Sequence, residues 1–307
     1  MTPRALVIGY GSIGARHARI LEALAFNVSV ASRRGEAGGR RVFRSVSEAM
    51  TSGAFDHVVV ADETVRHFAT LTELASAGHR GAVLVEKPLF VAPGPVPPHG
   101  FRAAAVGYNL RFHPVVAALR ETLGNRRAEI ASLHVGQWLG DWRPGREATT
   151  TYSASQARGG GVLRDLSHEL DLATWLFGPW MRVAALGGRL GTVTIDADDG
   201  WGILMVCKRC PVVTLHLDAL DRVGRRTIVV QVDGETLRAD LVAATLEIGS
   251  DIRRFSVARD ATYATMHRAM LHGSADLCTF DEGLRVVDLV DAVERAARDL
   301  RWIERAA

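Results

Sequence analysis

The chain begins with a pattern that few folds accommodate. The apolar run 5–9 leads into Gly9-Tyr10-Gly11-Ser12-Ile13-Gly14, and apolar residues at helical spacing follow. Between a strand and a helix, this G-x-G-x-x-G spacing is typical of dinucleotide binding, because the glycines permit a tight turn, close approach of a pyrophosphate and close helix–strand packing. The N–H groups at the helix start would face the phosphates. A merely structural glycine turn is the alternative.

The alternation of strand and helix continues through the first third of the chain. Further apolar runs at 27–31, 57–61 and 82–86 predict strands, while Ser45 with Glu48 predicts a capping box and 64–77 a helix. This order predicts a parallel, doubly wound sheet. A proline-rich stretch at 91–98 excludes a helix there.

The pattern changes near residue 127. Long β-rich runs follow, broken by one predicted helix at 164–177, and a strongly periodic helix is expected at 280–298. Consecutive strands with tight turns predict an antiparallel or mixed sheet. We therefore predict an α/β chain with a Rossmann domain over 1–112 and an α+β domain with a large open sheet over 113–307, the last helix packing back on the first domain.

Composition excludes several classes of protein. The chain has 307 residues, is 48% hydrophobic and 23% charged, and contains three cysteines. These values are typical of a globular protein, and no apolar run approaches the length that spans a membrane. Without a secretory pattern at the start, we expect a cytoplasmic protein with no membrane partner. The net charge of +3 is spread over scattered basic residues, which argues against nucleic acid as a partner.

The residues after the second predicted strand bear on the cofactor. An acidic residue that would bind the ribose of NAD is missing, and Ser32, Arg33 and Arg34 stand there instead. A hydroxyl and two guanidinium groups suit a 2′-phosphate, so we expect NADP, with NAD as the alternative. The alternative, which we consider weaker, is that the two arginines are solvated surface charges.

Lysine is scarce in this chain. Of 37 basic residues only Lys87 and Lys208 are lysines. Arginine keeps its proton, whereas the amine of a lysine can be tuned to lose it. Lys87 follows a predicted strand at the sheet edge where ligands bind. We therefore expect a functional role for Lys87, against the alternative of an ordinary surface lysine.

Several motifs together resemble the Gfo/Idh/MocA family of sugar and cyclitol oxidoreductases. They are the glycine loop, Glu86-Lys87-Pro88, the segment 108–112, and the glycines 159–161 that run into the segment 165–171. The resemblance extends from residue 5 to about 300. It implies an NAD(P)-binding first domain, a sugar-like substrate, and a homodimer or homotetramer formed through the C-terminal sheet.

The resemblance also implies roles for individual residues. Lys87 would lie beside the nicotinamide and bind the reacting hydroxyl, His168 would be the general acid/base, and Asp165 its neighbour. A neutral imidazole suits proton abstraction near pH 7. Asp165 and His168 are three residues apart, and on one predicted helix they would share a face. Many family members have a spacing of four.

Other positions are expected to line the cofactor and substrate sites. Besides the loop at 9–14 and residues 32–34, we predict cofactor contacts from Ala61, Glu63, His67, Glu86, Lys87 and Asn109, although His67 could equally cap a helix. Aromatic rings stack on sugars and arginines bind anions. We therefore predict substrate contacts from Arg111, Trp138, Trp142, Arg143 and Tyr152, against the alternative that Trp138 fills the core. No metal site is predicted.

Cys207 and Cys210 form a single C-x-x-C at a predicted hairpin tip, where a metal or redox role is disfavoured.

We predict that the protein is an NADP-dependent oxidoreductase that moves a hydride between nicotinamide and a hydroxyl or carbonyl carbon. A non-catalytic NADP(H) sensor and a redox-assisted glycosidase are the alternatives.

Overall fold

The computed structural model describes residues 2–33, 35–142, 147, 149, 152–191 and 195–305. The chain forms two compact units. Unit 1 contains residues 1–112 and 259–287, and unit 2 contains 113–258 and 288–307. The chain thus returns to unit 1 after the second sheet, a crossing that a single boundary at residue 112 does not describe.

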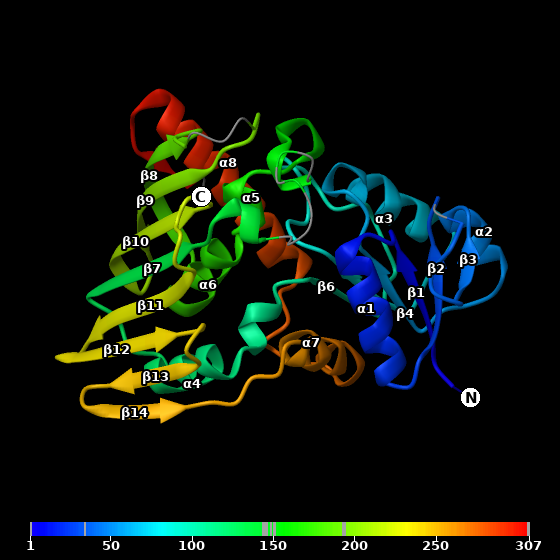
Figure 1. The fold of residues 1–307 in the computed structure, drawn as a ribbon, viewed down its shortest axis with the longest axis horizontal. Helices are drawn as coiled ribbons and strands as arrows, with labels where there is room; N and C mark the ends of the chain where they lie inside the picture. The colour runs from blue at the N-terminus through cyan, green and yellow to red at the C-terminus, as the bar shows by residue number, and fades with distance from the viewer. Residues whose placement is uncertain are drawn as a thin grey trace. The chain divides into compact units, whose positions relative to one another are not determined.

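Unit 1 is built on a six-stranded sheet (Figure 1). Its strand order is β3-β2-β1-β4-β5-β6, and every neighbouring pair is parallel. The strands are β1 (Arg4–Ile8), β2 (Asn27–Ala31), β3 (Arg41–Phe43), β4 (His57–Val60), β5 (Ala82–Val85) and β6 (Ala103–Val106). The central strands β1 and β4 are apolar apart from their first residues, Arg4 and His57, because both faces of these strands are buried. The predicted doubly wound sheet is therefore confirmed, and the short strand β3 is an addition to it.

Three helices connect strands of unit 1: α1 (Ser12–Ala23), α2 (Val46–Thr51) and α3 (His67–Ser76). Unit 1 also contains α7 (Ala261–His272), which follows β14 (Asp251–Arg254) in the chain, and the 3-10 turns η1 (Thr64–Arg66) and η2 (Asn109–Phe112). Helix α2 starts at the predicted capping box: the Ser45 hydroxyl accepts the Glu48 N–H at 3.1 Å. Helix α7 was not predicted, and it explains why residues 259–287 belong to unit 1.

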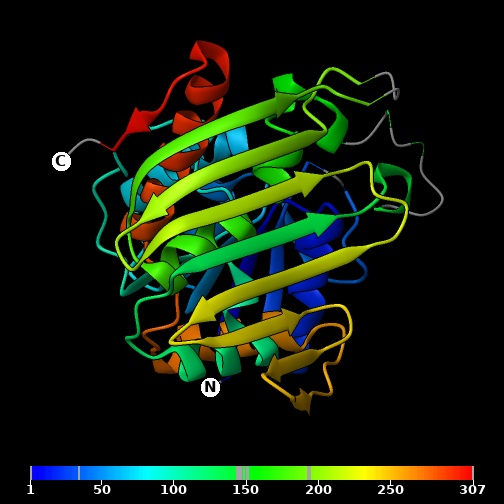
Figure 2. The same cartoon turned by 90° about the vertical axis from the view of Figure 1, so that its left-hand side faces the viewer.

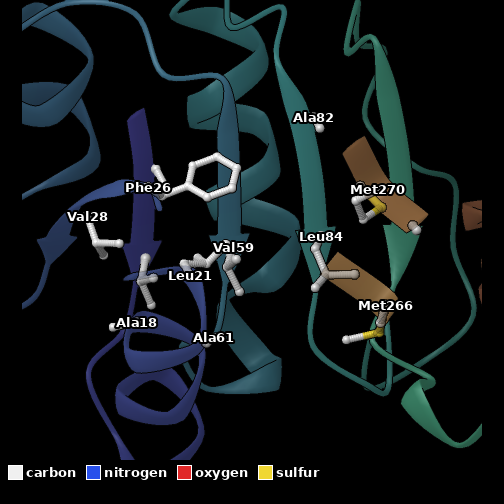
Figure 3. Close-up of a cluster of buried hydrophobic side chains, with 13 residues drawn as sticks. Ala18, Leu21, Phe26, Val28, Val59, Ala61, Ala82, Leu84, Met266 and Met270 are labelled. Atoms are coloured by element: carbon white, nitrogen blue, oxygen red, sulfur yellow. The ribbon is translucent and has the colours of Figure 1, made fainter. Parts of the chain in front are cut away.

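The core of unit 1 shows how α7 is held. Leu21 of α1, Val59 of β4 and Leu84 of β5 belong to one buried cluster with Met266 and Met270 of α7 (Figure 3). All five side chains are almost completely inaccessible to solvent. Burial of this apolar surface is the main force that holds the returning segment on the sheet.

Unit 2 is dominated by a nine-stranded sheet in the order β14-β13-β12-β11-β7-β10-β9-β8-β15 (Figure 2). Only β7 and β10 pair in parallel; the other pairs are antiparallel. The strands are β7 (Ile130–Gly136), β8 (Trp180–Gly188), β9 (Gly200–Cys207), β10 (Cys210–Asp218), β11 (Arg225–Val232), β12 (Glu235–Asp240), β13 (Thr245–Ile248), β14 (Asp251–Arg254) and β15 (Ile303–Glu304). The predicted mixed sheet is confirmed.

Helices cover one face of this sheet. Helices α5 (Val162–Asp165) and α6 (His168–Phe177) pack on the central strands, and α4 (Pro114–Leu123) packs on β12 and β13. The opposite face is turned toward the viewer in Figure 2, with no described element over it. Short 3-10 turns η3 (Leu139–Asp141), η5 (Tyr152–Ala154) and η6 (Gln156–Arg158) lie in the connections.

Two helices differ from expectation. The prediction of a single helix at 164–177 is wrong: Leu166, which lies outside helical geometry, is the C-cap of α5, and Ser167 is the N-cap of α6. Helix α8 (Phe280–Asp299) begins in unit 1 and ends in unit 2. Across the described residues, no helix combines the length and apolar character needed to span a membrane.

Candidate functional site

The glycine loop of unit 1 has one open position and two tight ones. A Cβ on Gly9, whose φ is +88°, would lie 2.5 Å from the Ala61 carbonyl oxygen, and one on Gly14 would collide with the Gly9 carbonyl. A Cβ on Gly11 would meet no atom within 4 Å. Gly11 precedes α1 and provides no side-chain cap, and the first turn of α1 has no acidic residue. The loop therefore fits a dinucleotide, whose pyrophosphate would lie against Gly11 and the start of α1.

The end of β2 carries the residues predicted to bind a 2′-phosphate. Ser32 is half-buried and Arg33 is exposed, while Arg34 lies outside the described residues. Sequence reasoning missed Arg40: its Nη1 donates to the Tyr10 hydroxyl at 2.8 Å, and its Nη2 lies 2.5 Å from Glu22. This hydrogen bond to Glu22 is the main cause of the raised pKa of Arg40. Arg40 thus holds Tyr10 of the glycine loop in place.

Glu86 and Lys87 follow β5 at the carboxyl edge of the sheet. Glu86 is buried, Lys87 is half-buried, and the backbone N–H of Lys87 donates to Glu86 Oε2 at 3.3 Å. Glu86 Oε1 lies 2.8 Å from Nε2 of His17, a fully buried residue of α1. Burial alone would raise the pKa of Glu86, but the hydrogen bond and charge of His17 and the charge of Lys87 lower it. The carboxylate is therefore ionised.

The other predicted cofactor residues of unit 1 have varied surroundings. Ala61 is buried beside the loop, and Glu63 precedes η1. Both nitrogens of buried His67 face backbone carbonyls, of Leu89 at 3.0 Å and Asp62 at 3.3 Å, which favours the structural alternative for this histidine. Asn109 is buried and donates to the Thr262 hydroxyl at 2.7 Å, which ties η2 to α7.

Asp165 and His168 lie in unit 2, whereas Lys87 lies in unit 1. Asp165 is the last residue of α5 and His168 the first residue of α6. His168 is 8% exposed and Asp165 is half-buried. The break between the two helices replaces the shared helical face that a continuous helix would have given them.

The glycines before α5 are explained by packing inside unit 2. A Cβ on Gly160 would collide with the Tyr152 carbonyl, and one on Gly161, whose φ is +114°, would collide with the Asp198 carboxylate. Asp198 accepts the Leu163 N–H at 2.8 Å and the Trp201 indole N–H at 2.6 Å. Burial raises the pKa of Asp198. The protein itself fills the space that a side chain would need at these two glycines.

The residue after His168 forms a buried ion pair. Both oxygens of Glu169 meet the Arg226 guanidinium, at 2.8 and 3.3 Å, and the side chain of Glu169 is 3% exposed. A two-bond pair of this kind fixes the planes of both groups. It fastens the start of α6 to β11 and so positions the backbone that carries His168.

The predicted substrate residues are spread over both units. In unit 2, Trp138, Trp142 and Tyr152 are half-buried, and the Arg222 guanidinium lies 3.4 Å from the centre of the Trp138 ring. Arg143 lies outside the described residues. In unit 1, Arg111 is 2% exposed and lies 3.3 Å from Glu282, which favours a structural role for it.

One group of side chains in the described residues has the composition of a metal site. His134, His216 and Asp218 lie on neighbouring strands β7 and β10, with potential ligand atoms within 4.8 Å of one another. Asp218 already accepts the backbone N–H groups of Leu220 and Asp221, and it lies 2.9 Å from His216. These bonds account for the cluster without an ion, so we assign no metal to it.

The C-x-x-C motif lies in a hairpin, as predicted. Cys207 ends β9, Cys210 begins β10, and the two are partners in the register. Burial raises the pKa of the Cys207 thiol to about 12 and also raises that of Cys210. Buried thiols with raised pKa values are poor nucleophiles, which supports the structural interpretation.

Comparison with known proteins gives a consistent fold. No curated protein matches the sequence. The structure of GenD2 from gentamicin A biosynthesis, in complex with NAD, superposes with a TM-score of 0.82 at 23% identity and covers 100% of this chain and 97% of that one. WlbA dehydrogenase from Bordetella pertussis, in complex with NADH and UDP-GlcNAcA, gives a TM-score of 0.77 at 19% identity, covering 100% and 98%.

A third structure and a family model extend this result. Levoglucosan dehydrogenase, in complex with NADH and L-sorbose, gives a TM-score of 0.83 at 15% identity and covers 98% of each chain. Residues 129–274, which include β7 to β14, match the model of the GFO/IDH/MocA C-terminal domain. This segment of the chain is therefore a C-terminal domain of the GFO/IDH/MocA type.

Proposed function

We propose that the protein is an NADP-dependent oxidoreductase that transfers a hydride between nicotinamide and a carbinol or carbonyl carbon of a sugar, a cyclitol or an anionic sugar derivative. The observation that carries this proposal is the open position at Gly11 before α1, within the same unit as Lys87. The similar folds include proteins in complex with NAD or NADH and sugar compounds, which supports the substrate class.

The assigned roles follow from the chemistry of each side chain. The nicotinamide, when bound, supplies the hydride acceptor. Lys87 binds the reacting oxygen and stabilises the charge that develops on it. His168 takes the hydroxyl proton as general base, with Asp165 beside it in sequence. In the reverse direction His168 returns the proton to the oxygen.

The chain offers a matched control for Lys87. Lys208, the only other lysine, is exposed in the β9–β10 turn. Turnover of D-glucose, myo-inositol and UDP-N-acetylglucosamine is followed with NADP⁺ at the nicotinamide absorbance band. We expect Lys87→Ala to lose more than tenfold in turnover, about 1.4 kcal/mol of barrier, and Lys208→Ala to lose nothing. Equal turnover of both variants would contradict the role of Lys87.

Tight NADPH binding without turnover would favour a non-catalytic sensor. Release of an aglycone without net redox change would favour a redox-assisted glycosidase.

We also propose that the protein pairs with itself through the open face of the unit 2 sheet. Leu186 is 67% exposed and Leu204 39% exposed on strands β8 and β9 of this face. They border a groove of about 630 Å³ that also includes Trp302. Light scattering should show a dimer or tetramer that Leu204→Asp dissociates.

A cytoplasmic location fits the absence of disulfides among the three cysteines, all of which are described.

A further inference from the structure

Unit 1 contains a chain of buried polar side chains that the proposed mechanism does not use. It starts at Glu86, beside Lys87, and continues through His17 of α1 and His267 of α7 to His57 of β4. The successive distances are 2.8 Å from Glu86 Oε1 to His17 Nε2, 2.8 Å from His17 Nδ1 to His267 Nε2, and 3.1 Å from His267 Nδ1 to His57 Nε2. All three imidazoles are completely buried.

Packing fixes this chain in one arrangement. Neighbouring rings are nearly perpendicular, with centroids 5.0 Å apart for His17 and His267 and 5.2 Å apart for His267 and His57. A Cβ on Gly107 would lie 3.0 Å from Glu86 Oε1, so glycine at this position leaves room for the carboxylate. Buried polar groups are costly unless they are paired, and here three elements of unit 1 and the residue after β5 contribute to one continuous set of pairs.

The charge states of the chain follow from its surroundings. Burial lowers the pKa of His57 to about 3, assisted by the charges of His17, Arg102 and His79. Burial, with His17 and His57 as neighbours, also lowers the pKa of His267 well below its ordinary value. Both imidazoles are therefore neutral.

Each charge state dictates the positions of the protons. An ionised Glu86 requires a proton on His17 Nε2. If His17 is neutral, its Nδ1 accepts from His267 Nε2, and His267 Nδ1 accepts from His57 Nε2. If His17 is charged, it donates at both nitrogens, so His267 carries its proton on Nδ1 and donates to His57. One proton therefore reverses every hydrogen bond beyond His17.

We propose that His17, backed by His267 and His57, keeps the buried Glu86 carboxylate ionised and so holds a negative charge against Lys87. The three histidines are positioning residues: they act on Lys87 through Glu86. Only the catalytic meaning of this arrangement rests on the proposed function, through the role of Lys87. The arrangement itself is a property of unit 1 that can be measured without substrate or cofactor.

The first experiment uses the scarcity of lysine. Competitive acylation of the full-length protein between about pH 7 and 11 reports the amine reactivity of Lys87, with Lys208 as an internal reference in the same molecule. In Glu86→Gln, which is nearly isosteric, Lys87 loses its negative neighbour. We expect its reactivity near pH 8, relative to Lys208, to rise at least about fivefold.

Three further variants test the histidine directly. His17→Ala removes the donor to Glu86, so burial should favour the neutral carboxyl, and Lys87 reactivity should rise as in Glu86→Gln. His17→Gln keeps an N–H donor and should restore most of the wild-type ratio. His113→Asn alters a buried histidine of unit 2 and should change nothing. An unchanged ratio in Glu86→Gln would overturn the proposal, even if His17→Ala failed to fold.

The second experiment observes the protons themselves. Nitrogen NMR of the ¹⁵N-histidine-labelled protein should show a proton on His17 Nε2 from about pH 5 to 8, with His57 and His267 neutral throughout. A bare His17 Nε2, or a charged His57 or His267 in this range, would contradict the proposal. Neither experiment depends on turnover, so loss of the Lys87→Ala effect would overturn the proposed function and leave this inference intact.

Discussion

The two glycine runs of this chain, 9–14 and 159–161, both precede a helix, but only the first contains an open position, at Gly11. At Gly11 the space that a side chain would fill is open, whereas at Gly160 and Gly161 it is filled by the Tyr152 carbonyl and the Asp198 carboxylate. The first run therefore has room for something from outside the chain, and the second has room only for the chain itself. A glycine motif indicates a close approach; the structure shows what approaches.

The largest effect that tests this comparison is expected at Gly161. Gly161→Ala would place a Cβ against Asp198 at a φ of +114°, where side chains are strained. We expect the free energy of unfolding to fall by about 3 kcal/mol or more, as for other combinations of backbone strain and overpacking. Urea unfolding of unliganded protein measures this loss. A variant as stable as the wild type would show that the segment relaxes freely.

The two units also differ in their buried ionic and titratable groups. Besides the Arg111–Glu282 pair, unit 1 contains the buried chain of Glu86 and three imidazoles, while unit 2 pairs Glu169 with Arg226, whose guanidinium keeps its proton at any relevant pH. The pKa of His57 is about 3 in the folded state and near 6.5 when unfolded. Between these values the unfolded chain binds more protons, so stability is lost as pH falls below 6.5.

This contrast predicts that acid weakens unit 1 first. At about pH 5, His57 alone should cost about 2 kcal/mol relative to pH 7, and His267 acts in the same direction. Hydrogen exchange, corrected for its intrinsic pH dependence, should show this loss in α1, β4 and α7 and a smaller one in β7 and β10. Equal losses in both units would contradict the assignment.

The third effect concerns the open position of the first run. Gly11→Ala meets no neighbour and has an ordinary φ of −81°, so stability should change by less than about 1 kcal/mol. The added methyl group should nevertheless obstruct the pyrophosphate and weaken NADPH binding about tenfold, or about 1.4 kcal/mol. Quenching of the six tryptophans measures the affinity. Unchanged binding would mean that the cofactor does not approach Gly11.

Whether a feature could be predicted from the sequence depends on how far apart in the chain the interacting residues lie. The strand–loop–helix start and the capping box at Ser45 depend on neighbours, and both are confirmed. The partner of Arg111 is 171 residues away and that of His17 on α7 is 250 residues away, so no local pattern reveals their buried pairs. The break in the helix at Leu166 was not predicted either, because Ser167 makes no side-chain cap that would mark a new helix.

The smallest effect sharpens the assignment of the cofactor. Ser32 and Arg33 follow β2, and Arg33 is exposed, so its guanidinium is available to a 2′-phosphate. A single exposed ion pair is weak, because water and salt screen it. Arg33→Ala should therefore weaken NADPH binding only about threefold, or about 0.7 kcal/mol, and leave NADH binding unchanged.

Exposed Arg44 provides a matched control, since its backbone N–H, not its side chain, is bonded to Glu48. Arg44→Ala should affect neither nucleotide. If Arg33→Ala weakened the binding of both nucleotides equally, Arg33 would support the loop and would not bind the 2′-phosphate. It would then no longer support a preference for NADP.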